Sequence, residues 1–88
     1  MIRTSGADLH PATGARFVFE REPGDPPRYR VHVYLPEARR IDCDLGWEDG
    51  AVRIEPLPDD AWVAAEIAKL ARVLHRDPKS RLTRWRGP

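Results

Sequence analysis

Apolar and polar residues alternate in short segments between residues 15 and 55, and this period of two predicts β-strands. Four such segments are present, each with its apolar side chains on one face and mostly charged side chains on the other. The apolar positions are Phe17 and Phe19, then Tyr29, Val31, Val33 and Leu35, then Ile41, Cys43 and Leu45, and last Val52 and Ile54. We therefore expect a four-stranded sheet with one apolar face.

Turn-forming residues separate the four segments. Residues 23–27 read Pro-Gly-Asp-Pro-Pro, and prolines cannot donate to a sheet ladder. Residues 36–38 form the second turn. Asp49 and Gly50 stand between apolar flanks, which is the strongest short signal for a two-residue hairpin turn with positive φ at both central positions. Consecutive strands joined by short turns predict an antiparallel meander.

Charge complementarity on the polar face predicts how the strands pair. If Phe19 lies opposite Val31, then Glu20 lies opposite Arg30, so opposite charges meet outside while apolar side chains meet inside. The other predicted pairs are Val33 with Ile41, His32 with Asp42, Arg30 with Asp44, Trp47 with Val52, and Leu45 with Ile54.

A helical stripe follows the fourth strand. Val63, Ile67, Leu70 and Leu74 recur at the spacing of one helix face. Asp59 or Asp60 is suited to cap its start, and Pro78 disfavours helical geometry at the preceding residue, so we expect the helix to end near Arg76. The fold class is therefore α+β, a four-stranded antiparallel meander covered on one face by a C-terminal helix.

The two ends of the chain are less regular. Residues 1–14 lack sustained periodicity and predict a flexible arm before a single domain over residues 15–76. Residues 77–88 form a basic extension, where Asp77 and Pro78 favour a short second helix with Leu82 and Trp85 on one face. A disordered tail, or a solvated tail that docks Leu82 and Trp85, is the alternative.

The length and the cysteine content limit the classes of protein. The 88 residues allow one domain with a small core. Cys43 is the only cysteine, so an internal disulfide and a cysteine-based zinc site within one chain are excluded, and a reducing compartment is favoured. There is no apolar run of membrane-spanning length and no signal peptide pattern, so we expect a cytoplasmic protein.

Residues with catalytic potential are few. Cys43 lies on the apolar face of its strand, with Ile41 and Leu45, as a core cysteine does. The two aspartates beside it would raise the pKa of its thiol, which disfavours a nucleophile. His32 is expected to face Asp42 or Asp44, and an imidazole held by a carboxylate serves as the general base in many catalytic sites. No nucleophilic side chain is expected nearby, so a cross-strand ion pair is favoured. The three histidines are scattered and no glycine-rich phosphate motif occurs. We expect no catalytic residue, no cofactor and no metal, hence no enzyme.

Charge is distributed unevenly along the chain. Residues 1–68 carry 8 basic and 13 acidic side chains, whereas residues 69–88 carry 7 basic and 1 acidic. The predicted contact residues in this basic end are Lys79, Arg81, Arg84, Trp85 and Arg86, a mixture of cations and an aromatic that suits nucleic acid or a protein partner. Weaker candidates on the polar sheet face are Arg28, Arg30, His32 and Tyr34.

Two functional hypotheses follow. A single sheet with one helix leaves edges and one face uncovered, which favours a binding module for protein–protein interaction or homo-oligomerisation. Binding of nucleic acid through the basic C-terminal segment is the alternative.

Overall fold

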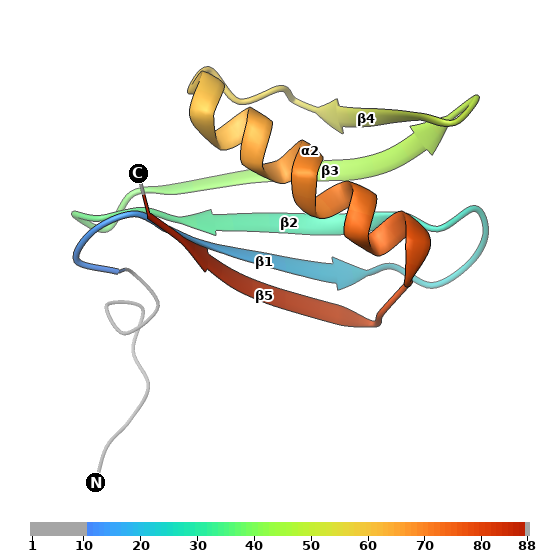
Figure 1. Cartoon of the computed structure of the whole chain (residues 1–88), viewed down its shortest axis with the longest axis horizontal. Coiled ribbons are helices and arrows are strands. Elements are labelled where there is room, and N and C mark those ends of the chain that lie inside the picture. Colours follow the sequence, from blue (N-terminus) through green and yellow to red (C-terminus); the bar gives the residue numbers. More distant parts are fainter. Residues whose placement is uncertain (1–10, 88) are drawn as a thin grey trace, which may run out of the picture.

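The computed structural model describes residues 11–87. The elements follow one another as β1 (Ala15–Arg21), β2 (Tyr29–Tyr34), β3 (Arg40–Glu48), β4 (Ala51–Glu55), α2 (Ala61–Arg76) and β5 (Arg81–Arg86). All neighbouring strands are antiparallel, and the sheet order is β4-β3-β2-β1-β5. Helix α2 lies diagonally over one face and carries the chain from the β4 edge to the opposite edge (Figure 1). The predicted arm over residues 1–14 falls largely outside the described residues.

The predicted meander is confirmed together with its registers. Phe19 pairs with Val31 and Glu20 with Arg30. The remaining predicted pairs are all present, namely Val33 with Ile41, His32 with Asp42, Arg30 with Asp44, Trp47 with Val52 and Leu45 with Ile54. Asp49 and Gly50 have φ of 53° and 81°, as a hairpin turn of this type requires. Local alternation and turn chemistry agree, so this part of the sheet follows directly from the sequence.

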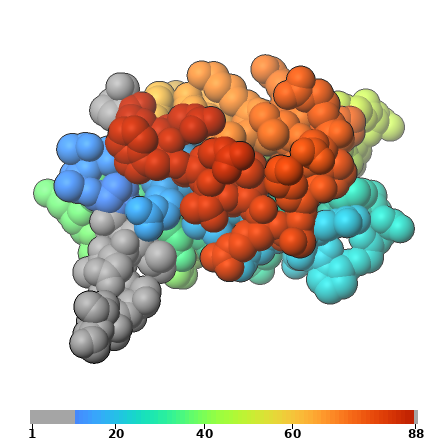
Figure 2. All heavy atoms as spheres, turned by 60° about the horizontal axis from the view of Figure 1, so that its bottom comes forward, coloured from blue at the N-terminus to red at the C-terminus, as the bar shows by residue number. Residues whose placement is uncertain are grey.

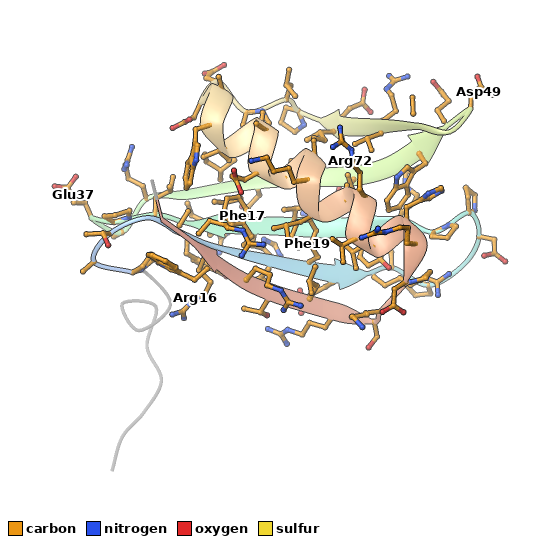
Figure 3. The ribbon with its side chains drawn as sticks, viewed as in Figure 1. Arg16, Phe17, Phe19, Glu37, Asp49 and Arg72 are labelled. Atoms are coloured by element: carbon orange, nitrogen blue, oxygen red, sulfur yellow. The ribbon has the colours of Figure 1, made fainter. Side chains whose placement is uncertain are left out.

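The helix also begins and ends where expected. Asp60 is its N-cap, and the carboxylate accepts hydrogen bonds from the backbone N–H groups of Trp62 at 2.9 Å and Val63 at 3.2 Å. After Arg76 the chain leaves helical geometry at Asp77, whose N–H still donates to the carbonyl of Val73. The apolar stripe of α2 packs on the sheet above Phe17 and Phe19, which are fully buried (Figure 3).

The prediction of four strands and a second short helix is wrong, because residues 81–86 form a fifth strand paired with β1. A strand turns alternate side chains to opposite faces, so Leu82 and Trp85 do not share a face. Leu82 lies opposite Phe19 and is 3% exposed, whereas Trp85 is 51% exposed. Pairing with β5 provides hydrogen-bond partners for the main-chain groups on the side of β1 that faces away from β2. No local pattern in residues 77–88 indicates this pairing.

The core agrees with the predicted list except at its margin. Ile41, Val52 and Ile54 are only partly buried. Two of them lie on β4, which is an edge strand of the sheet formed by residues 11–87. The structure adds Ala15, Val18, Ala71 and Leu82 to the buried apolar residues.

Candidate functional site

Strand β5 holds four of the five predicted contact residues. Arg81, Arg84, Trp85 and Arg86 lie on β5, and Lys79 lies just before it. Figure 2 looks onto this side of the molecule, where β5 runs along the surface below α2. Alternation along the strand separates the four residues. Arg84 and Arg86 share the face of buried Leu82, while Arg81 and Trp85 lie on the other face.

Most cations of this segment already have carboxylate partners. Arg81 lies 3.6 Å from Glu20, and Lys79 lies 2.9 Å from Asp77. The hydrogen bond from Lys79, and its charge, hold the pKa of Asp77 below its usual value. Among residues 11–87, Arg84 has no carboxylate partner.

The side chain of Arg86 contacts helix α2 through Glu66. Its Nε lies 3.6 Å from Oε1 of Glu66, the one charged residue of α2 that is buried. The other carboxylate oxygen of Glu66 contacts Lys69 at 3.0 Å. Glu66 thus ties the end of β5 to the helix.

The main chain of β5 has one paired side and one outward side. Arg21 N–H donates to the carbonyl of Ser80, so by antiparallel alternation Leu82, Arg84 and Arg86 direct their N–H and C=O groups toward β1. The N–H and C=O groups of Arg81, Thr83 and Trp85 therefore face away from the sheet. No other described strand pairs with this side.

Two arginines cover part of this outward edge. Nη1 of Arg84 donates to the carbonyl of Thr83 at 2.8 Å, and Nη1 of Arg86 donates to the carbonyl of Trp85 at 3.1 Å. Charged side chains on an edge strand oppose uncontrolled pairing with other chains. The outward N–H groups of β5 therefore pair with no other described strand, while two of its outward carbonyls accept hydrogen bonds from arginine side chains.

Trp85 is held in place although it is half exposed. Its Nε1 donates to the carbonyl of Thr13 at 3.0 Å. Gly14 lies beneath the ring at φ 73°, and a Cβ there would come within 2.4 Å of the carbonyl oxygen of Arg86. Gly14 is therefore required both for its backbone conformation and for the close approach of β5.

The polar sheet face is a network of ion pairs, and it includes the cross-strand pair of His32 with Asp42 that the sequence favours. His32 Nδ1 donates to Asp42 Oδ1 at 2.7 Å, and Nε2 of His32 lies 3.7 Å from Glu20. Arg40 contacts Asp42 at 3.0 Å. Burial acts to raise the pKa of Asp42, but the His32 hydrogen bond and the charge of Arg40 outweigh it and hold that pKa below its usual value.

The other candidates on this face add little chemistry. Arg30 lies 3.1 Å from Asp44, and the ring of Tyr34 lies 6.5 Å from that of His32. Arg28 lines a hollow of about 140 Å³ together with Arg53 of β4 and carboxylates of β3 and β4. Arg30 and His32 are already paired with carboxylates, so the face offers no concentrated site.

Cys43 has the environment of a core residue. It is buried, and burial together with the charges of Asp44 and Asp42 raises the pKa of its thiol to about 11. The thiolate that nucleophilic chemistry needs is therefore scarce at neutral pH. Within residues 11–87, no group of three His, Cys, Asp or Glu side chains is arranged to hold a metal ion. No helix in the same range has the length and apolar character of a membrane span.

A second surface was missed by sequence reasoning. An open groove of about 690 Å³ lies between α2 and the β3–β4 hairpin, and Trp47 and His75 stand at one end with ring centroids 5.2 Å apart. Lys69, Arg72 and Arg76 line its helix side. Their helical spacing is visible in the sequence, but the approach of Trp47 to His75 depends on how α2 crosses the sheet.

No protein-family model, curated protein or solved structure matches this chain.

Proposed function

We propose that this chain is a protein-binding module whose contact site is the outward edge of β5, where an extended acidic segment of a partner adds as a sixth strand. The observation that carries this proposal is the side of β5 with which no other described strand pairs, where the N–H groups of Arg81, Thr83 and Trp85 point outward. Strand addition takes its affinity from main-chain hydrogen bonds and its specificity from alternate side chains.

The charge of the edge selects the partner. An incoming strand displaces the guanidinium groups of Arg84 and Arg86 from the carbonyls of Thr83 and Trp85. The released guanidinium groups then lie beside alternate side chains of the incoming strand on the helix side. Carboxylates at those positions form cross-strand pairs with them. On the other face, Trp85 provides apolar area for a β-branched or aromatic side chain.

Two other interpretations fit this edge less well. Pairing of β5 with a second copy brings two segments together that each carry Arg81, Arg84 and Arg86, and like charges oppose such pairing. Nucleic-acid binding through Lys79 and β5 needs the cations on one surface, whereas a strand divides them between two faces.

The test uses an eight-residue labelled peptide in which Glu alternates with Val, and a control peptide in which Lys replaces Glu. Fluorescence anisotropy at low and moderate salt measures binding. We expect the acidic peptide to bind and the basic peptide not to bind. Light scattering of the protein alone gives its mass, and a dimer that β5 substitutions dissolve would favour self-association instead.

A proline substitution isolates the main-chain contribution. Thr83→Pro removes an N–H that points away from β1, so the β1–β5 ladder keeps its hydrogen bonds. We expect binding of the acidic peptide to weaken at least tenfold, about 1.4 kcal/mol. Thr83→Ala keeps the N–H and should bind like the parent. Equal binding by the Pro and Ala variants, with unchanged thermal melting, would contradict strand addition.

A further inference from the structure

The groove beside α2 has a chemistry that the β5 edge lacks. Arg72 and Arg76 have no ion-pair partner among the described residues, and no carboxylate in that range lines the groove. Figure 3 shows Arg72 on the side of α2 that faces β4. Arg76 lies seven helical steps after Lys69, which is about 10 Å along the axis, and Arg72 lies between them. Lys69 also contacts Glu66 at 3.0 Å, so the two arginines provide the unpaired charge. The groove is therefore a positive strip with room for more than one anionic group.

An aromatic pair ends this strip. The rings of Trp47 and His75 are tilted by 30° at 5.2 Å, and Tyr29 braces Trp47 from the core edge-on at 6.0 Å. A second hollow of about 300 Å³ lies beyond the pair and is lined mainly by apolar groups, namely Pro26, Pro27, Trp47, Leu74, His75 and Pro78. A flat ring can stack against the pair while its charged substituent remains in the positive strip.

We propose that this groove binds single-stranded nucleic acid, with phosphates along Lys69, Arg72 and Arg76 and an unpaired base against Trp47 and His75. A duplex is excluded from this mode because its bases are stacked and paired. A strand is favoured over a free nucleotide because the arginines are exposed, so each attracts a phosphate weakly and several contacts must add. This site is separate from the β5 edge and does not depend on it.

The experiment titrates the protein into fluorescein-labelled single-stranded dT12 and follows anisotropy from low to moderate salt. For single strands, the slope of log affinity against log salt is about −0.7 for each phosphate contact. Arg72→Gln/Arg76→Gln should therefore bind more weakly and lose about 1.4 of that slope. The matched control Arg21→Gln/Arg39→Gln removes the same charge at two exposed positions outside the groove, and its slope should equal the parent's.

The stacking part has its own variant. His75 is exposed, so His75→Ala should leave the melting temperature close to the parent's while dT12 affinity falls about tenfold. The proposal is overturned if dT12 does not bind at low salt, or if both double variants lose the same slope. It is also overturned if duplex DNA binds as tightly as dT12, or if thymidine monophosphate competes equally well at equal nucleotide concentration.

Discussion

Replacement of Leu82 by alanine tests whether β5 belongs to the folded core. Leu82 is 3% exposed and lies opposite Phe19, so truncation removes apolar contacts and leaves a cavity beside a fully buried ring. Leu→Ala in cores costs about 2–5 kcal/mol, and we expect about 2–3 kcal/mol here because the edge strand can relax toward the gap. For a domain of this size that corresponds to a fall in melting temperature of roughly 8–24 °C.

The matched control is Leu57→Ala. Leu57 is 66% exposed, so the same change of side chain should alter the free energy of unfolding by no more than about 0.5 kcal/mol. Urea titration and thermal circular dichroism of both variants give the comparison. If Leu82→Ala costs as little as Leu57→Ala, then β5 is not packed on the sheet in solution, and the assignment of residues 81–86 to the core is refuted.

Two further predictions concern the cap and the cysteine. Asp60→Ala should lower the free energy of unfolding by about 1 kcal/mol, because the carboxylate accepts hydrogen bonds from two N–H groups at the start of α2. Asp59→Ala, in the adjacent position, should change this free energy little. Urea titration of both variants measures the difference, and equal effects would contradict the cap. Cys43 should react with a thiol reagent at pH 8 far more slowly in the folded protein than in urea, because burial and two aspartates raise its pKa to about 11; a folded protein that labels as fast as the unfolded chain would show that the thiol is accessible.

The predicted contact residues illustrate how far sequence reasoning reaches. Lys79, Arg81, Arg84, Trp85 and Arg86 are recognisable as a basic segment from residue types alone. Which of their atoms face outward depends on the pairing of β5 with β1. The predicted helix placed Leu82 and Trp85 on one face, because helical side chains repeat about every 3.6 residues. In the strand, side chains alternate every two residues, so the two residues lie on opposite faces.

The groove beside α2 shows the same limit. Arg72 and Arg76 are predictably on the exposed side of a helix, since the apolar stripe defines the buried side. Trp47 comes from β3, and only the diagonal course of α2 brings it to His75. No spacing in the sequence indicates the contact between Trp47 and His75.

The meander and the helix follow from the sequence alone, because each depends on residues that are close together in the chain. Alternation, a two-residue turn and opposite charges set the registers, and an aspartate with an apolar stripe set α2. Residues 81–86 form a strand for a reason that appears only in the folded sheet. The main-chain N–H and C=O groups along one side of β1 need hydrogen-bond partners, and residues 81–86, which are far away in sequence, provide them. These six residues have only a weak local preference, so the pairing with β1 determines their conformation.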